Sequence, residues 1–337
     1  MPMTAMIAFF EKNLFLFGLL AVVGLAFVFP GLGADEGPLR AGLLSKLGVM
    51  VIFFLQGLSL KTRELVAGFH DGRLHAFVQG WIFLISPLVL FGAGWSLHGI
   101  GHGELAAGFF YLGLLPTTIA SAVAFSTAAG GNVAGALFNT TLANVLGVFW
   151  VPLGCLVFFS VGGGWQGQLI GPLLLKLVWL ILLPLVLGQF LRPVLAKLPF
   201  FGKVATKFKY INHGIILFIV FTAFAGSVLD ATWKSVPPAS LVWLFALTLG
   251  AVLIIHFMVW ISSGWILDRP ADRISAFFCG SQKTLAAGVP MAVAIFHDGG
   301  QLSGINLSLL LLPLLCYHPL QLFLAAVVLP RLPRSER

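Results

Sequence analysis

The sequence predicts an all-α integral membrane protein with ten membrane-spanning helices, arranged as two inverted repeats of five. Two observations predict the membrane class. Hydrophobic residues make up 59% of the 337 residues and charged residues only 9%, and the mean hydropathy is +1.03. A soluble chain of this size would carry about 25% charged residues. A third observation, similarity between segments half a chain apart, predicts the repeats.

Ten apolar segments are separated by loops rich in Gly, Pro and charged residues, which predicts ten spans. The first segment is long for a signal peptide and similar segments follow it throughout, so we interpret it as a span. The predicted spans are 13–31, 42–60, 76–97, 104–129, 132–161, 168–191, 210–229, 238–266, 271–297 and 304–330.

Lysine and arginine are distributed unevenly between the two sides of this arrangement. If the N-terminus is inside, the inner segments hold Lys12, Lys61, Arg63, Arg73, Arg192, Lys197, Lys203, Lys207, Lys209, Arg269, Arg273, Arg331, Arg334 and Arg337. The outer loops hold Arg40, Lys46 and Lys234, while Lys176 and Lys283 lie inside spans. Cytoplasmic loops of membrane proteins are enriched in these residues. We therefore expect an inner-membrane, multi-pass protein with both termini in the cytoplasm.

The internal repeat rests on one shared offset of 169 residues. It superimposes Gly130 in "AAGGNVAGALFN" on Gly299 in "FHDGGQLSGINL", and "VIFFLQGLSL" (51–60) on "VFTAFAGSVL" (220–229). The halves, 1–165 and 166–337, would each contain five spans. Because five is odd, they must have opposite orientations, and inverted repeats of this kind are frequent in secondary transporters.

Transporters built in this way bind substrates and ions near the membrane midplane, on interrupted helices at corresponding positions of the two halves. Span 4 contains "LLPTTIASAV", in which Pro116 removes a backbone donor. Span 9 contains "CGSQKTLAAGVP", in which Gly280 permits an unwound backbone. We expect interruptions within 115–122 and 279–284. The polar residues at these breaks are candidate substrate or ion ligands: Thr117, Thr118, Ser121, Ser281, Gln282, Lys283 and Thr284.

Lys283 is the unusual member of this set. At a rise of ~1.5 Å per residue it lies roughly 15 Å from Arg273 and roughly 22 Å from Asp298, near the middle of a ~30 Å hydrocarbon core. A charge there costs about 3 kcal/mol on insertion scales. We expect its ammonium to face the protein interior, bonded to backbone carbonyls or to Thr and Asn side chains of spans 4 and 5. Two roles remain open: a substrate counter-ion or proton carrier, and a structural tether.

Span 5 adds further candidates in "GALFNTTLAN". Asn139, Thr140 and Asn144 share one helical face, which favours either a site or hydrogen bonding between helices. Asn132 follows the Gly-Gly turn, where it would cap span 5 or contribute to binding. None of the histidines has the ligand spacing of a metal site, so we expect no metal and no resident cofactor.

Several stretches together resemble the bile acid:sodium symporter superfamily, and more closely its branch of bacterial YfeH-like proteins and the seventh member of human solute carrier family 10. They are "FFLQGLSLKTREL" (53–65), "GGNVAGALFNTTLANVLGVFWVPL" (130–153), "PADRISAFFCGSQKTLAAGVPMAVAIF" (270–296) and "YHPLQLFL" (317–324). The resemblance implies a panel domain of spans 1, 2, 6 and 7 and a core domain of spans 3–5 and 8–10. It also implies that spans 4 and 9 are unwound and cross in the core.

The sequence departs from the sodium-coupled members at residues that bind sodium. Phe278 stands near the position of a glutamate that belongs to both sodium sites. The Ser-Asn pair of span 4 becomes Ser121-Ala122, and a span 5 serine becomes Ala136 while a threonine is kept as Thr140. Cation sites lined only by neutral oxygens are costly in a low-dielectric core. A tethered ammonium at Lys283 would then stand where a sodium ion sits.

The leading hypothesis is a secondary active transporter that moves a small organic anion by alternating access, with the lipid bilayer as its surroundings and no nucleic-acid partner. Its coupling ion would be Na⁺, implied by the resemblance, or H⁺. The alternatives are a Lys-dependent carrier without sodium sites and a regulatory membrane protein that does not transport. The sequence contains no paired intramembrane carboxylates and no H-E-x-x-H motif, which argues against an enzyme. Substrate identity, stoichiometry and oligomeric state stay open.

Overall fold

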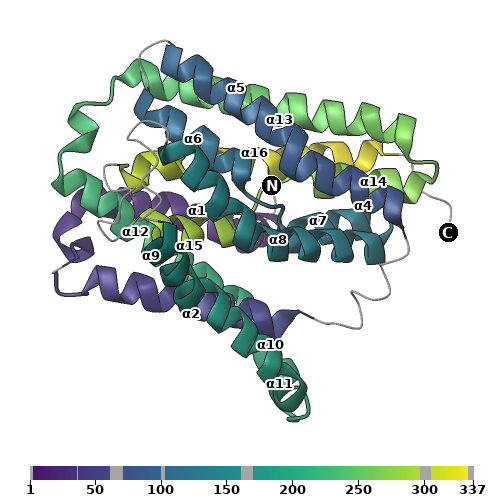
Figure 1. Ribbon diagram of the computed structural model, residues 1–337, viewed down its shortest axis with the longest axis horizontal. Helices are drawn as coiled ribbons and strands as arrows, with labels where there is room; N and C mark the ends of the chain where they lie inside the picture. Colours follow the sequence, from purple (N-terminus) through teal and green to yellow (C-terminus); the bar gives the residue numbers. More distant parts are fainter. Residues whose placement is uncertain are drawn as a thin grey trace. The chain divides into compact units, whose positions relative to one another are not determined.

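Helices form all the regular structure that the computed structural model describes (Figure 1). The ranges described are 3–35, 37–60, 71–99, 103–160, 170–296 and 305–332. The chain divides into two units. Unit 1 comprises Met1–Ser59, Leu175–Val236 and Val289–Ser308, and unit 2 comprises Leu60–Leu174, Pro237–Gly288 and Leu309–Arg337.

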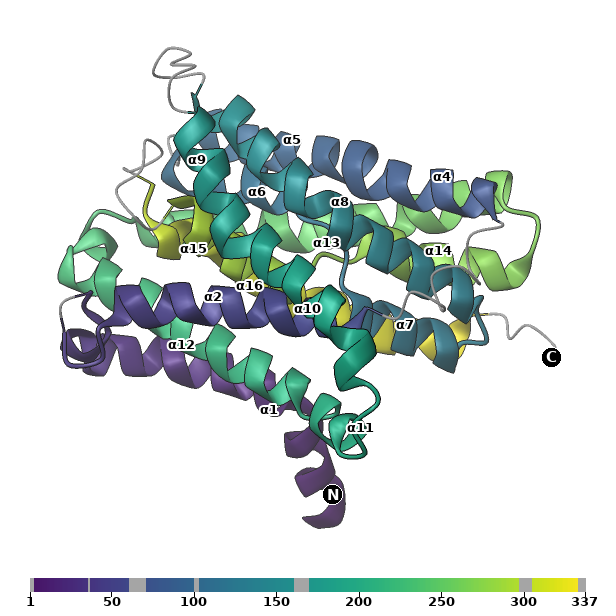
Figure 2. The same cartoon turned by 60° about the horizontal axis from the view of Figure 1, so that its bottom comes forward.

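Unit 1 is built from apolar helices joined by short turns. Its elements are α1 (Met3–Val28), η1 (Pro30–Gly33), α2 (Ala41–Ser59), η4 (Val178–Leu182), α10 (Leu183–Leu195), α11 (Phe201–Ala205), α12 (Phe208–Leu229) and η5 (Thr232–Lys234). Helices α2 and α10 lie side by side, as do α1 and α12 (Figure 2). A hydroxyl pair, Ser45 and Thr222, joins α2 to α12 at 3.4 Å.

Two glycines let α2 and α10 approach to backbone contact. A methyl group built at Gly57 would collide with the carbonyl oxygen of Leu185, and one built at Gly188 would collide with the carbonyl oxygen of Phe54. The contact is therefore reciprocal, with each glycine facing the backbone of the other helix. Small residues at helix interfaces allow this close packing in membranes, where van der Waals contact drives helix association.

Unit 2 contains the longest helices. Its elements are α4 (Gly72–Gly80), η2 (Trp81–Ile85), α5 (Ser86–Gly99), α6 (Gly103–Leu114), α7 (Ile119–Ala128), α8 (Val133–Ser160), α13 (Pro238–Ile266), α14 (Pro270–Ser281), α16 (Leu307–Val328) and η6 (Leu329–Arg331). Three helices are divided between the units. Helices α9 (Ile170–Leu177) and α15 (Leu285–Phe296) each begin in unit 2 and end in unit 1, whereas α16 begins in unit 1 and ends in unit 2.

A π-helical turn, η2, connects α4 and α5 into one continuous helical stretch, Gly72–Gly99. In this turn the amide of Ser86 donates to the carbonyl of Trp81, five residues earlier. The next residue, Pro87, has no amide hydrogen to give. The carbonyl of Ile82 consequently loses its usual helical donor, Ser86, and gains none from the following residue. π-Bulges of this kind occur frequently at functional sites.

Seven helical stretches of the described residues are long and apolar enough to cross a membrane. They are Ala41–Ser59, Gly72–Gly99, Val133–Phe159, Leu175–Leu195, Phe201–Leu229, Pro238–Ile266 and Leu307–Arg331. A bent pair, Leu105–Leu114 and Ile119–Ala128, adds an eighth, and Leu14–Val28 is a shorter apolar helix. The helices fit a multi-pass membrane protein. The total of ten spans and their inverted repeat stay predictions.

Replacing Gly57 or Gly188 by Ala is expected to lower the melting temperature of the purified protein, because each new methyl group must push α2 and α10 apart. Overpacking of this kind costs ~1–3 kcal/mol. Gly24→Ala in α1 is the matched control, since nothing lies within 4 Å of a Cβ built there. Equal melting temperatures for all three variants would contradict the backbone contact.

Candidate functional site

Two interrupted helices of unit 2 meet at their breaks. Helix α6 ends at Leu114 and α7 begins at Ile119, with a bend of 61° between them. Helix α14 ends at Ser281 and α15 begins at Leu285. The amide of Thr284 donates to the carbonyl of Pro116 at 2.9 Å, which joins one break to the other. Both interruptions, 115–118 and 282–284, fall inside the ranges that the sequence predicts.

The physical causes of the two breaks differ. Pro116 cannot donate a hydrogen bond and disfavours helical geometry in the residue before it. Gly280, by contrast, does not lie in the unwound segment. It belongs to the last turn of α14, and unwinding begins at Gln282, whose φ of −90° and ψ of 152° are extended. Gly280 instead permits close packing, because a Cβ there would lie 3.3 Å from the side chain of Trp81.

The ammonium of Lys283 is buried and donates to three backbone carbonyl oxygens. Its Nζ donates to Leu115 at 2.8 Å, to Gly113 at 2.9 Å and to Ile82 at 3.1 Å. The residue is 1% exposed. An ammonium has three hydrogens and no acceptor, so these three bonds satisfy it. The predicted geometry is confirmed for the carbonyls of span 4, and span 3 supplies the third.

Each of the three oxygens is available because a helix is interrupted beside it. Ile82 lost its helical donor to the π-turn and to Pro87. Gly113 and Leu115 lie at the C-terminal end of α6, where the donors four residues later belong to the unwound segment or to α7. The last carbonyls of a helix have no intrahelical partner and carry the negative end of its dipole. The break in α6 thus creates a fixed site for a cation, which Lys283 fills.

The described part of unit 2 contains a buried carboxylate, but it lies elsewhere. Asp272, 4% exposed, forms an ion pair with Arg269 at 2.6 Å and accepts a hydrogen bond from Asn132 at 2.8 Å. Arg269 also pairs with Asp71. Among the described residues no carboxylate forms a salt bridge with Lys283, so its charge is balanced by backbone dipoles.

Gln321 of α16 holds the backbone of Lys283 with both ends of its amide. The amide of Lys283 donates to Oε1 of Gln321 at 2.7 Å, and Nε2 of Gln321 donates to the carbonyl of Lys283 at 2.9 Å. This pair of bonds replaces the two that the residue would form within a helix. Gln321 is therefore the residue that allows the chain to stay extended at a buried position.

Tyrosines close the unwound segment on both sides. The hydroxyl of Tyr317 donates to the carbonyl of Ser281, the last residue of α14, at 2.9 Å. The hydroxyl of Tyr111 donates to the carbonyl of Gly288 in α15 at 2.5 Å. Both side chains are fully buried. Thr284 caps α15 by accepting a bond from the amide of Ala287 at 3.3 Å.

Two polar atoms at the breaks have no partner. Gln282 accepts a bond from the hydroxyl of Ser121 at 2.7 Å, but its Nε2 is buried and unpaired. Thr117 is completely buried, with Oγ1 also unpaired. Ser121 further contacts Thr118 at 3.3 Å. Buried polar groups are normally hydrogen-bonded, so the free donor of Gln282 and the free hydroxyl of Thr117 are the two groups at the breaks that a polar ligand or water would satisfy.

The candidates of span 5 separate into three groups. Asn144 reaches the crossing, because its Nδ2 donates to the carbonyl of Thr117 at 2.8 Å. Thr140 donates to Ala136 of its own helix at 2.9 Å. Asn139 lies against α4, where Gln79 donates to it at 3.1 Å and His75 contacts it at 3.0 Å. Hydrogen bonding between helices therefore accounts for Asn139.

Asn132 lies away from Lys283, at the start of α8. Its Oδ1 accepts the amide of Gly135 at 2.9 Å, which makes it the helix cap that the sequence predicts. Its Nδ2 donates to Asp272. Ser281 is likewise engaged with its own helix, since its hydroxyl donates to the carbonyl of Phe277 at 2.6 Å. The structure thus brings together Lys283, Gln282, Thr284, Thr117, Thr118, Ser121 and Asn144.

Sequence reasoning missed three residues of the site: Gln321, Tyr317 and Tyr111. Gln321 and Tyr317 belong to "YHPLQLFL", a segment noted only for its resemblance. The available signal was a polar amide two residues after Pro319 inside an apolar helix. Pro87, in the middle of span 3, was the sequence signal that the carbonyl of Ile82 would lack a helical hydrogen-bond donor.

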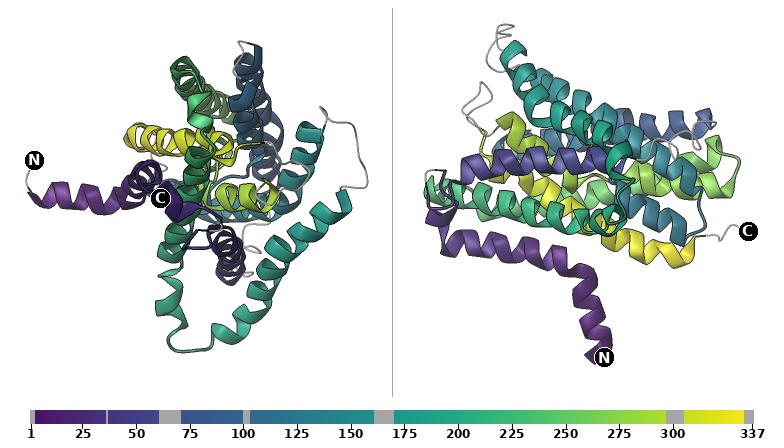
Figure 3. Two further views of the ribbon diagram at one scale, coloured as in Figure 1. Left: turned by 90° about the vertical axis from the view of Figure 1, so that its left-hand side faces the viewer. Right: turned by 90° about the horizontal axis from the view of Figure 1, so that it is seen from below.

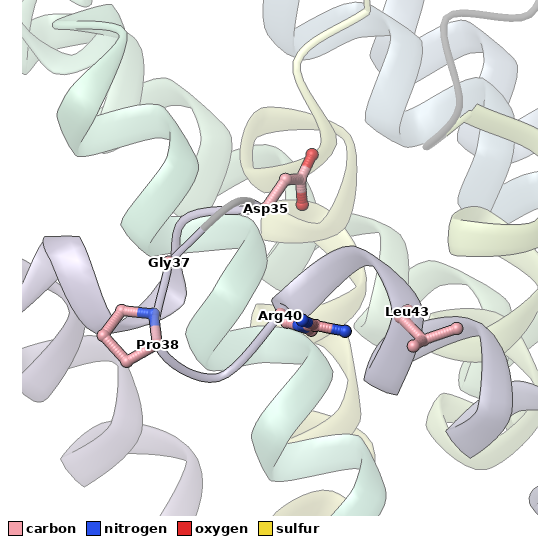
Figure 4. Close-up of a pocket in the computed structure, with 5 residues that line it drawn as sticks. All are labelled: Asp35, Gly37, Pro38, Arg40 and Leu43. Atoms are coloured by element: carbon pink, nitrogen blue, oxygen red, sulfur yellow. The ribbon is translucent and has the colours of Figure 1, made fainter.

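A surface pocket in unit 1 lies outside this site. Asp35, Gly37, Pro38, Arg40 and Leu43 line it in the turn before α2 (Figure 4). Arg40 has a left-handed backbone conformation, with φ at 44°. No group of three or more His, Cys, Asp or Glu that could hold a metal occurs in the described ranges.

Long apolar helices with paired breaks around a buried polar site are the features of a membrane transporter. The family model of the SBF-like CPA transporter family matches residues 13–334, and the chain belongs to that family. Members of this family are transporters and not enzymes.

Individual relatives match along nearly the whole chain. YfeH of Escherichia coli (strain K12) is 33% identical over 323 residues, which cover 94% of this chain and 92% of YfeH. Sodium/bile acid cotransporter 7 of Danio rerio is 31% identical over 337 residues, covering 96% and 95% of the two chains. The Mus musculus protein of the same name is 30% identical over 330 residues, covering 95% and 92%.

Replacing Gln321 by Leu is expected to lower the melting temperature strongly, because the amide and the carbonyl of Lys283 lose their partners in a buried place. An unsatisfied buried group costs about 1–3 kcal/mol. Gln56→Leu in α2 is the matched control, because the side chain of Gln56 forms no hydrogen bond within the described residues. A melting temperature of Gln321→Leu equal to that of the control would contradict the clamp.

Proposed function

We propose that the protein is a secondary active transporter that moves a small organic anion across the inner membrane, with Lys283 as a built-in cation at the substrate site. The observation that carries the proposal is the ammonium of Lys283, held by three carbonyls at the meeting point of two interrupted helices. Its family membership and relatives support the transporter class.

Alternating access is the proposed mechanism, with one domain moving against the other. Unit 1 contains most residues of the predicted spans 1, 2, 6 and 7, and unit 2 contains most residues of spans 3–5 and 8–10. This division supports the proposed panel and core domains. The two breaks, 115–118 and 282–284, correspond to within three residues under the offset of 169, which supports the proposed inverted repeat.

The charge of the substrate is inferred from the groups at the crossing. Helices α7 and α15 both begin there, and the N-terminal end of a helix attracts anions. The unpaired Nε2 of Gln282 is a donor without a partner. The unpaired hydroxyl of Thr117 can also donate. These groups suit an oxyanion such as a carboxylate.

We propose that this protein does not couple transport to sodium, although some of its relatives are named sodium/bile acid cotransporters. Phe278, near the expected glutamate position, is completely buried and stacks on Phe125 with ring centroids 5.4 Å apart. An apolar ring contact thus occupies the position that would hold a carboxylate. The carbonyls of Gly113 and Leu115, which could coordinate a free cation, already bind Lys283. We propose protons, or the fixed charge of Lys283 alone, in place of sodium.

Lys283→Met keeps the side-chain stem and removes the charge, and Lys283→Arg keeps the charge on a larger head. If Lys283 carries substrate or coupling charge, Lys283→Met is expected to abolish uptake into reconstituted vesicles while the protein remains folded. Uptake of a panel of radiolabelled carboxylates under an imposed proton or sodium gradient provides the measurement. If folded Lys283→Met takes up substrate at the wild-type rate, Lys283 does not carry substrate or coupling charge and is only a structural tether.

Sodium is expected to leave the stability of the protein unchanged. A site of millimolar affinity would add RT ln(1 + [Na⁺]/Kd), which is about 2.7 kcal/mol at a hundred times Kd. Thermal unfolding in matched concentrations of sodium, lithium and potassium chloride tests this. A selective increase in melting temperature with sodium would restore the sodium-coupled mechanism.

A further inference from the structure

The turn between α10 and α12 concentrates positive charge. Residues 192–210 contain Arg192, Lys197, Lys203, Lys207 and Lys209. No acidic residue occurs in the sequence between Glu104 and Asp230. In the described residues no carboxylate pairs with any of these five side chains. We call residues 192–210 the basic turn.

The basic turn is a folded element. Helix α11 lies within it, where α10 and α12 meet (Figure 3, left). Phe201, Ala205 and Phe208 pack against Leu55 and Leu58 at the end of α2, and the rings of Phe201 and Phe208 lie 6.2 Å apart. Arg192 donates to the carbonyl of Leu58 at 2.9 Å. The basic turn therefore packs against α2 through its inward residues, and its exposed lysines belong to a folded element.

The outward side of the basic turn alternates cations with large apolar groups. Lys197, Lys203, Lys207 and Lys209 are all exposed. Phe200 is 57% exposed and Tyr210 is 61% exposed. Lys209 lies over the Tyr210 ring, 4.8 Å from its centroid. A surface that only needed to stay soluble would not expose these rings between the lysines.

The length of α12 places the basic turn at the boundary of the membrane. Helix α12 has 22 residues, or ~33 Å at 1.5 Å per residue, which is enough to cross a ~30 Å hydrocarbon core. Helix α11 and the exposed Lys197, Lys203 and Lys207 precede α12 in the chain, and Lys209 lies in its first turn. Aromatic rings are enriched at this level, and lysines reach from it toward headgroups.

We propose that the basic turn binds the headgroups of anionic phospholipids in the leaflet it faces, with Phe200 and Tyr210 inserted among the lipids. Clusters of four to eight Lys and Arg next to a membrane helix bind anionic lipids through charge. The rings favour a lipid over a soluble polyanion, since only a lipid offers phosphate and apolar surface together. The proposal is independent of the transported substrate, because every residue concerned belongs to unit 1.

The test compares a triple variant, Lys197→Gln, Lys203→Gln and Lys207→Gln, with a control that neutralises Arg40, Lys46 and Lys234. Each protein is placed in nanodiscs of phosphatidylcholine alone or of phosphatidylcholine with phosphatidylglycerol, and its melting temperature is measured. Binding of added phosphatidylglycerol in detergent is counted by native mass spectrometry. Each lysine near a membrane surface is worth roughly a fivefold change in affinity.

Phosphatidylglycerol is expected to raise the melting temperature of the wild type and of the control, and to leave that of the triple variant unchanged. Phosphatidylglycerol binding by the triple variant is expected to fall at least tenfold. Phe200→Ser, which keeps every charge, is expected to weaken lipid binding without weakening the response to inorganic phosphate. Equal lipid responses in the triple variant and the control would overturn the proposal. An equal gain from inorganic phosphate alone would also overturn it.

Discussion

The arrangement of unit 2 depends on keeping the Lys283 ammonium satisfied far from water. A lysine at this depth is costly, and the structure offsets the cost with three carbonyl oxygens at 2.8–3.1 Å. Those oxygens come from two helices, so the breaks, the π-turn and the side chain depend on one another. If α6 were continuous, two acceptors would be lost to backbone hydrogen bonds. If η2 were an ordinary α-helical turn, the third would be lost.

Prolines and an amide side chain have opposite roles in this arrangement: the prolines leave carbonyls without helical donors, and the amide satisfies unwound backbone groups. Pro116 interrupts α6, which leaves the carbonyls of Gly113 and Leu115 open to Lys283, and Pro87 lacks the amide that would bond Ile82 in the π-turn. Gln321 instead satisfies backbone groups. The extended backbone of Lys283 needs one donor and one acceptor, and the glutamine amide offers both. The tyrosines then satisfy carbonyls at the adjoining helix ends. The buried Nε2 of Gln282 and Oγ1 of Thr117 remain without a hydrogen-bond partner.

A lysine bound in this way differs physically from a bound sodium ion. Both place a positive charge on helix C-terminal carbonyls, but the lysine cannot leave. A sodium ion can drive a transport cycle because it binds and is released. A tethered ammonium stays in the protein, so the charge at this place changes only if the segment moves or the lysine loses a proton. Near the expected position of the carboxylate, the structure has Phe278, packed on Phe125.

The sequence by itself determined the membrane class, the seven long apolar helices of the described residues and the two breaks, because hydropathy, Pro116 and the isolated charge of Lys283 are local signals. The total of ten spans remains a prediction. It also identified the cap at Asn132. Only the tertiary structure decided which oxygens surround the ammonium, that Gln321 clamps the unwound chain, and that Asn139 and Asn132 belong to other contacts. It also showed that Gly280 serves packing rather than unwinding. These outcomes depend on which segments distant in sequence become neighbours, and periodicity along one helix carries no information about the partner on the next.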